Sequence, residues 1–203
     1  MSQEDVRVRA AVNSDLDEIA RIYAHYVTNS VATFEERPWD VKEWSAKVAG
    51  LAGLGLPCLV ATAGSATVGA APGTGAAAET ETRVVGYAYV SPWRPKPAYR
   101  HTVEDSVFLA PGWTGRGIGG RLLRELIAQS TAAGARQMIA VIADAGNDAS
   151  ALLHRRLGFA DAGRLASVGF KHGRWIDTLL LQRELSPGSA VPGPAFPLPT
   201  PPA

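Results

Sequence analysis

The sequence predicts an α/β (α+β) fold in one domain, and three observations support this prediction. Short apolar runs with strand character alternate with segments whose apolar residues recur at helical spacing. The apolar run 107–109 leads through a glycine-rich loop into a helical pattern that begins at Ile118. A length of 203 residues with 46% hydrophobic residues is enough for one well-packed core. We therefore expect a sheet covered by helices.

The N-terminal part predicts one strand and two helices. Residues 6–10 alternate between apolar and polar side chains, as in a half-exposed strand. A helix follows from about residue 14 to residue 28, and a second one is expected over residues 40–52. The loop between them carries an aromatic residue, Phe34, which fits either core packing or contact with a ligand.

Two further strands are expected over residues 59–63 and 84–90, with an unusual connection. Residues 64–83 between them are rich in Gly, Ala and Thr and contain little to bury. We interpret them as a flexible insertion at the tip of a hairpin, because long surface loops cost little additional entropy. The single cysteine, Cys58, precedes the first of these strands, where we expect a buried thiol.

A loop with three cations and three prolines follows over residues 91–100. Arg94 and Lys96 lie within it, each next to a proline that restricts the backbone. Such a loop is either a solvated basic surface or a clamp for a carboxylate, since planar Arg and compact Lys both bind carboxylates. The residues alone leave both interpretations open.

The glycine-rich loop is the strongest indication of a ligand. Gly115, Gly117, Gly119 and Gly120 lead directly into a helix, whose first backbone N–H groups are unpaired and carry partial positive charge. This arrangement binds phosphate groups, and Arg116 adds a full charge. The spacing of a nucleoside-triphosphate loop is absent, and the match to a dinucleotide pattern is weak. A tight turn without a ligand is the alternative.

The C-terminal part predicts three strands, a helix and a tail. Residues 137–142 form a buried strand run, and the helix after it ends at Gly158. Residues 168–171 and 177–183 predict the last two strands. We place the domain at residues 1–185, because the proline-rich residues 186–203 predict a disordered tail.

Composition excludes several classes of partner. The formal net charge of +1 gives no strong attraction to nucleic acid. No apolar run approaches the ~20 residues needed to cross a bilayer, and the N-terminus lacks the pattern of a signal peptide. A single cysteine excludes an internal disulfide. We therefore expect a cytoplasmic protein without nucleic-acid or membrane partners.

Residues 114–119, Thr-Gly-Arg-Gly-Ile-Gly, resemble the pyrophosphate loop of the GNAT N-acetyltransferase superfamily, although Thr114 stands where Gln or Arg is usual. Stretches 93–104, 147–159 and 169–177 resemble the phosphinothricin and methionine sulfoximine N-acetyltransferases within it. The resemblance implies the GNAT fold, a mixed, mostly antiparallel twisted sheet with helices on both faces. It also implies acetyl-CoA as co-substrate, a small amino-acid analogue as acceptor, a homodimer, and no metal.

The resemblance also implies roles for individual residues. Glu104 falls on the proposed general base of the family, and His154 on its second catalytic candidate. The cofactor-binding positions are Val107, Phe108, Leu109, Thr114, Gly115, Arg116, Gly117, Ile118, Gly119 and Asn147. The substrate-binding positions are Phe34, Arg94, Pro95, Lys96, Glu104, Asp105 and Ser106.

Several alternatives stay open at this point. Glu104 could form a structural ion pair with Arg100 or Arg94, and His154 could be a histidine at the edge of the core. Lys96 departs from the nearest relatives, so the preferred substrate is not fixed. A GNAT enzyme for another amine, such as a peptide N-terminus or a polyamine, is one rival function. A non-catalytic CoA-binding dimer is another.

Overall fold

The computed structural model describes residues 5–64, 82–146, 148–186 and 196. The strands in these parts are β1 (Val6–Ala10), β2 (Cys58–Gly64), β3 (Thr82–Pro92), β4 (Thr102–Leu109), β5 (Gln137–Ala143), β6 (Ala160–Lys171) and β7 (Arg174–Glu184). The α-helices are α1 (Leu16–Asn29), α2 (Val41–Gly53), α3 (Ile118–Ala132) and α4 (Ala149–Arg156). Short 3-10 turns lie at Asn13–Asp15 and Pro97–Tyr99.

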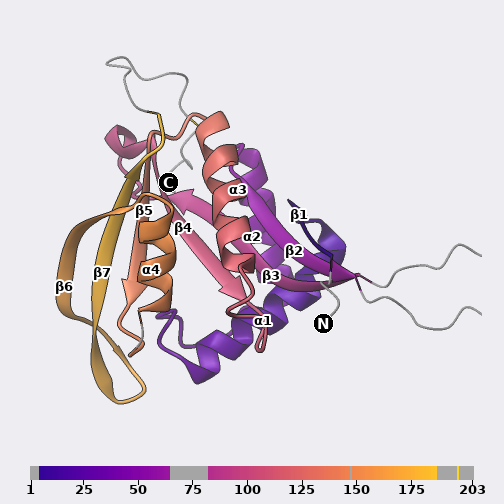
Figure 1. Ribbon diagram of the computed structural model, residues 1–203, viewed down its shortest axis with the longest axis horizontal. Helices are drawn as coiled ribbons and strands as arrows, with labels where there is room; N and C mark the ends of the chain where they lie inside the picture. Colours follow the sequence, from indigo (N-terminus) through magenta and orange to yellow (C-terminus); the bar gives the residue numbers. More distant parts are fainter. Residues whose placement is uncertain (1–4, 65–81, 147, 187–195, 197–203) are drawn as a thin grey trace, which may run out of the picture.

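The strands form one mixed sheet in the order β1-β2-β3-β4-β5-β7-β6 (Figure 1). Every neighbouring pair in it is antiparallel except β4 and β5, which are parallel. The parallel pair is joined through α3, as a parallel connection requires a crossover. The predicted α/β class with a mixed, mostly antiparallel sheet is therefore confirmed.

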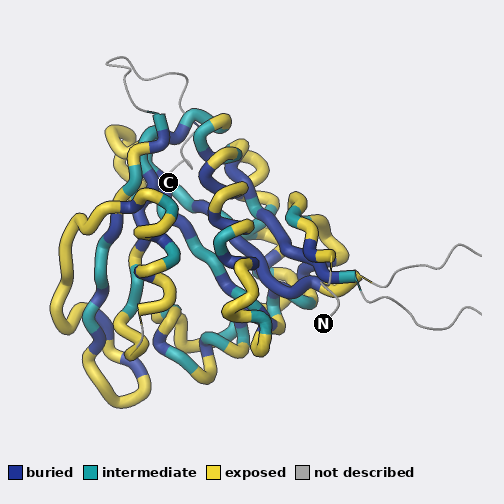
Figure 2. The backbone as a smooth tube through the Cα atoms, in the orientation of Figure 1, coloured by how far each residue is buried: buried dark blue, intermediate teal, exposed yellow. Residues whose placement is uncertain are grey.

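Helices cover both faces of the sheet, as expected. Figure 1 shows α3 and α4 in front of the strands and α1 and α2 behind them. Because side chains alternate along a strand, the sheet divides the apolar residues into two clusters. The cluster under α1 and α2 contains Trp44, Val60, Tyr87 and Phe108. The cluster under α3 contains Leu59, Ala61, Ala88 and Val103, together with the leucines of the helix. Figure 2 shows the buried residues concentrated along the central strands.

A local sequence motif determines where α2 begins. The Asp40 carboxylate accepts a hydrogen bond from the backbone N–H of Glu43 at 2.8 Å. The Glu43 carboxylate in turn accepts from the N–H of Asp40 at 2.8 Å. This reciprocal pair satisfies two donors that the helix itself leaves unpaired. It holds α2 with Trp44 turned into the core.

Two expectations concern segments that the structure describes only in part. Most of the predicted insertion lies outside the described residues, which stop at Gly64 and resume at Thr82. Of the predicted tail, Ser186 and Phe196 are described, and Phe196 is buried in the cluster under α3. At that residue the tail packs on the domain. The domain boundary stays a prediction.

The described helices contain none that is both long and apolar enough to cross a membrane. Within the same parts of the chain, no group of three or more His, Cys, Asp or Glu side chains is arranged to hold a metal ion.

Candidate active site

An opening lies between β4 and β5, the two parallel strands. Residues 102–104 pair with residues 137–139, and beyond this stretch the two strands part. Residues 140–143 continue to pair with β7 on the other side. The main chain of residues 105–109, which includes the predicted cofactor positions Val107, Phe108 and Leu109, thus faces β5 without pairing to it. Those backbone groups of residues 105–108 that point away from β3 can offer hydrogen bonds to a ligand.

The loop after β4 has the conformation expected of a phosphate cradle. Gly115 and Gly117 both have φ of +76°, a region that disfavours residues with a Cβ. Gly117 is the N-cap of α3, so the unpaired N–H groups of Ile118 and Gly119 begin at this point. A Cβ on Gly115 or Gly117 would meet no described atom within 4 Å. The turn from Thr114 to Gly117 is therefore exposed and leads directly into the unpaired N–H groups at the start of α3, an arrangement that can bind phosphate groups.

An aromatic contact orients the cation of this loop. The Arg116 guanidinium lies 4.5 Å from the centroid of the Trp113 ring, within the range of a cation–π interaction. Trp113 packs against both apolar clusters, which fixes its ring relative to the sheet. Arg116 therefore adds its charge from a defined place beside the glycines.

Glu104 is half-buried on the face of the sheet that carries α2. It pairs in register with Ser91 of β3, so both side chains point to the same face. Burial raises the pKa of Glu104, and the neighbouring Asp105 adds to the shift. The positive charges of Lys47 and Arg94 oppose it, and the net effect is a raised pKa. A carboxylate with a raised pKa is a stronger base than a carboxylate with its ordinary pKa.

Lys47 of α2 lies on the same face close to Glu104, although it was not among the predicted site residues. Its ammonium donates to the Ser91 hydroxyl at 2.9 Å and lies 5.2 Å from the centroid of the Tyr89 ring. Burial lowers the pKa of Lys47, and the charge of Glu104 partly restores it. A lysine on the inner side of an otherwise apolar helix face is the signal that could have identified it.

His154 and Asp105 meet on the opposite face. The His154 Nε2 lies 2.9 Å from Asp105 Oδ2, and both side chains are almost fully buried. Asp105 follows Glu104 in β4, so the two carboxylates point to opposite sides of the sheet. The structure therefore does not bring Glu104 and His154 together. It places Asp105 against His154, away from the face that carries Glu104.

Phe34 lies in the loop between α1 and α2 and is 40% exposed. Its ring packs against β6 at Gly169. A Cβ on Gly169 would come within 2.3 Å of the Phe34 ring, so only glycine fits below it. The Lys171 ammonium donates to the carbonyl oxygen of Thr33 at 2.8 Å and ties the same loop to β6. Phe34 is thus held at the surface and lies outside the two apolar clusters of the core.

The predicted clamp residues Arg94, Pro95 and Lys96 are exposed in the loop after β3. The Arg94 guanidinium lies 5.0 Å from the centroid of the Trp93 ring. Its positive charge acts to lower the pKa of Glu104. Ser106 is half-buried and hydrogen-bonds the Tyr89 hydroxyl. Asn147, the remaining predicted cofactor position, lies outside the described residues.

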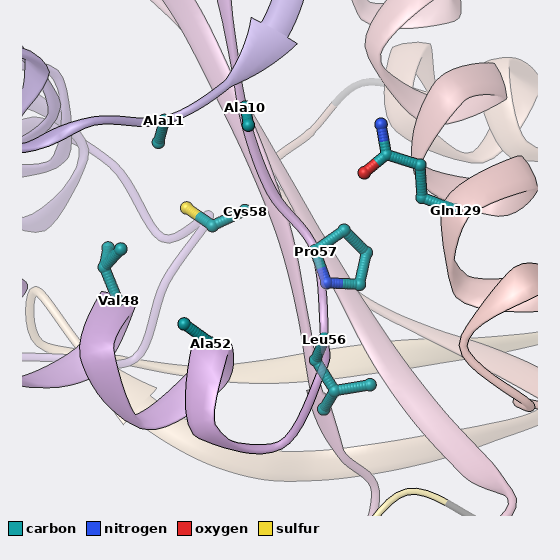
Figure 3. Close-up of a pocket in the computed structure, with 8 residues that line it drawn as sticks. All are labelled: Ala10, Ala11, Val48, Ala52, Leu56, Pro57, Cys58 and Gln129. Carbon is teal, nitrogen blue, oxygen red and sulfur yellow. The ribbon is translucent and has the colours of Figure 1, made fainter.

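A separate pocket of about 180 Å³ lies between α2, α3 and the facing ends of β1 and β2 (Figure 3). Its lining is mostly apolar and includes Cys58 and Gln129. Burial raises the pKa of the Cys58 thiol to about 12, so the thiol stays protonated and unreactive. Neither Glu104 nor the glycine loop lines this pocket.

Comparisons with known proteins indicate the family. A model described as the acetyltransferase (GNAT) family matches residues 34–159. The chain is 45% identical to a phosphinothricin N-acetyltransferase of Alcaligenes faecalis over 91% of this chain and 85% of that protein. It is 38% identical to an L-methionine sulfoximine/L-methionine sulfone acetyltransferase of Pseudomonas aeruginosa, over 91% and 98% of the two chains. A Sinorhizobium meliloti phosphinothricin acetyltransferase solved with acetyl-CoA superposes with a TM-score of 0.79 at 41% identity, covering 94% of this chain and 95% of that one.

Proposed function

This chain belongs to the GNAT acetyltransferase family, and from that premise we propose which amine it acetylates. It is an acetyl-CoA-dependent N-acetyltransferase. We propose that the acceptor is the α-amino group of a small amino-acid analogue of the phosphinothricin, methionine sulfoximine or methionine sulfone type. Acetylation would remove the charge of that amine and protect a cell from such a compound. The observation that carries the proposal is the half-buried Glu104 among cations, next to the opening between β4 and β5.

The glycine loop supports a role in binding the cofactor. The exposed turn from Thr114 to Gly117 and the N-terminus of α3 can offer main-chain N–H groups to a diphosphate, and Arg116 adds charge. Acetyl-CoA supplies an acetyl group activated as a thioester. Residues 107–109 pair with β3 but not with β5, and their main chain on the β5 side can bind the arm of the cofactor and polarise the thioester carbonyl through an N–H group.

We assign the role of general base to Glu104. An α-ammonium group is mostly protonated near neutral pH, and it must lose a proton before the nitrogen can attack. Glu104 accepts this proton, directly or through water, and its raised pKa suits the task. His154 lies on the opposite face of the sheet and is not placed to take part in this step.

The surroundings of Glu104 support a substrate that carries both an amine and an acid group. Lys47 and Arg94 bring positive charge to the face that carries Glu104, where they can attract a carboxylate or phosphinate group and donate hydrogen bonds to a sulfone. Pro95 and Lys96 extend the same basic loop.

We also propose a homodimer and a cytoplasmic location. The hairpin of β6 and β7 exposes Val168, Phe170 and Trp175, the last at 65%. β6 is an edge strand with an unpaired side, a typical place for contact with a second copy. The single cysteine suits a reducing compartment, and we propose the cytoplasm.

Release of CoA from acetyl-CoA tests the proposed substrate class. We expect the highest kcat/KM with phosphinothricin, methionine sulfoximine or methionine sulfone, in a panel that also contains a short peptide and a polyamine. Acetylation of the peptide or polyamine alone would refute the class. Binding of CoA with turnover of no amine would favour a non-catalytic module.

Replacement of the proposed base provides the matched test of mechanism. Glu104→Gln should lower kcat by more than about tenfold and keep the affinity for CoA, because the base contributes to the chemical step alone. Glu125→Gln, at an exposed position of α3, is the control and should keep kcat. An unchanged kcat in Glu104→Gln would remove this residue from the mechanism.

A further inference from the structure

Both ring nitrogens of His154 face oxygen atoms. The Nδ1 atom lies 2.7 Å from the carbonyl oxygen of Ser150, one turn earlier in α4. The Nε2 atom lies 2.9 Å from Asp105 Oδ2. The side chains of His154 and Asp105 are only 4% and 2% exposed. The pair is therefore shielded from water by the core on this face of the sheet.

The protons of this pair can be counted from its geometry. A carbonyl oxygen accepts hydrogen bonds only, so Nδ1 of His154 carries a hydrogen. One further proton then lies between Nε2 and Oδ2, either on the ring or on the carboxyl group. Burial lowers the pKa of His154, but the hydrogen bond and charge of Asp105 outweigh it and the net pKa is raised. In each arrangement both nitrogens are engaged, and neither is available to a substrate.

The position of the pair in the fold indicates another task. Asp105 is the first residue of β4 beyond the stretch that pairs with β5. His154 belongs to α4, which packs on β5 and β7. The hydrogen bond therefore links α4, which covers β5 and β7, to β4 at the point where β4 and β5 stop pairing. Phe159 packs on the ring at 4.9 Å between centroids and fixes it from another side.

We propose that Asp105 and His154 are positioning residues: their buried hydrogen bond holds β4 at a fixed distance from α4, and so sets the width of the opening that receives the thioester arm. This inference rests on the proposed binding of acetyl-CoA at that opening. It assigns His154 a place in binding the cofactor and no proton transfer to the reactants. Removing the contact should impair the affinity for CoA more than the chemical step.

Substitutions of Asp105 separate the contact from its proton. In Asp105→Asn the side-chain amide donates to Nε2 of a neutral His154, so the contact stays and the shared proton is gone. We expect the Kd for CoA, measured by calorimetry, and kcat to stay within about threefold of the parent. In Asp105→Ala the contact is lost, and the Kd for CoA should rise at least about fivefold.

His154→Gln provides a second, independent variant. The amide of Gln can reach Asp105 from the same helix position and donate to its carboxylate, but it cannot take part in acid–base chemistry. We expect it to retain CoA affinity and kcat. A loss of kcat above about tenfold in His154→Gln or Asp105→Asn, with unchanged CoA affinity, would overturn the proposal in favour of proton transfer.

Affinity for CoA also keeps this test independent of the acceptor amine. If the parent protein acetylates none of the proposed analogues, the substrate class fails, yet the Kd series still reports on the contact. Unchanged CoA affinity in Asp105→Ala would overturn the positioning role. So would an equal loss of affinity in Asp105→Asn and Asp105→Ala. Should Asp105→Ala fail to fold, the two conservative variants still decide between the roles.

Discussion

At the scale of single residues, the base of the site depends on a balance between burial and charge. Burial and the adjacent Asp105 raise the pKa of Glu104, which makes it a stronger base but protonates more of it at a given pH. Lys47 and Arg94 lower the pKa and keep more of the carboxylate ionised. The two cations thus extend the pH range over which Glu104 can accept a proton.

The pH dependence of the reaction should reveal this balance. Glu104 must be ionised to act, so kcat/KM should rise with pH through its pKa. Lys47→Met removes a charge that lowers this pKa, and the acidic limb of the profile should therefore move to higher pH. Lys42→Met, at an exposed position of the same helix, is the control. An acidic limb that stays in place in Lys47→Met would contradict the proposed coupling.

The same residues show what sequence can reveal at this scale. Glu104 could be identified as a candidate because stretch 93–104 resembles a motif of the family, and such a motif lies within one segment of the chain. The contacts of Lys47 with Ser91 and of Asp105 with His154 join distant segments and depend on how α2 and α4 pack on the sheet. No pattern within one segment encodes such a contact, so the partner of His154 could not be predicted.

At the scale of elements, the unit of β4, the glycine loop and α3 is the central part of the candidate site. β4 is anchored on one side by pairing with β3 and at its end by the Tyr26 hydroxyl, which donates to the Leu109 carbonyl at 2.8 Å. Its other side is left open where β5 turns away. The loop then reverses the chain through glycines with positive φ, so that the N-terminus of α3 lies beside the end of this open strand.

A single methyl group should disturb this unit. Gly117→Ala forces a Cβ into a left-handed N-cap, at a cost of about 1 to 3 kcal/mol, and narrows the approach to the helix N-terminus. We expect the Kd for CoA to rise at least about fivefold. Gly50→Ala in α2, where a Cβ meets nothing within 4 Å, is the control and should keep this Kd. Calorimetry measures both, and equal affinities would argue against the cradle.

Prediction of the elements succeeded where both faces of a strand are buried. The continuous apolar runs of β2, β3 and β5 identified these strands, because both of their sides face apolar surroundings. β6 starts at Ala160, whereas the sequence predicted a strand only from residue 168. Its first nine residues are exposed and include Gly163, so there is no alternation to detect. Pairing with β7 alone specifies this edge strand.

At the scale of the whole molecule, the hairpin of β6 and β7 at one edge of the sheet contacts the loop before α2. Phe34 packs on Gly169, and Lys171 donates to Thr33, so the hairpin helps to hold this loop in place. The apolar side chains of the same hairpin, Phe170 and Trp175, lie 5.1 Å apart between ring centroids and are exposed. A second copy covering them would also fix the position of Phe34.

Disrupting the proposed dimer should therefore affect the acceptor amine and spare the cofactor. Trp175→Glu places a charge where we expect the partner to bury an aromatic ring, and light scattering should show a monomer at micromolar concentration. Because the hairpin carries the Phe34 loop, the KM for the amine should rise, while the Kd for CoA stays unchanged at the distant glycine loop. Val12→Glu, beside β1 at the opposite edge of the sheet, exposes its side chain similarly and should leave the dimer intact. A Trp175→Glu protein that remains dimeric would place the subunit contact elsewhere.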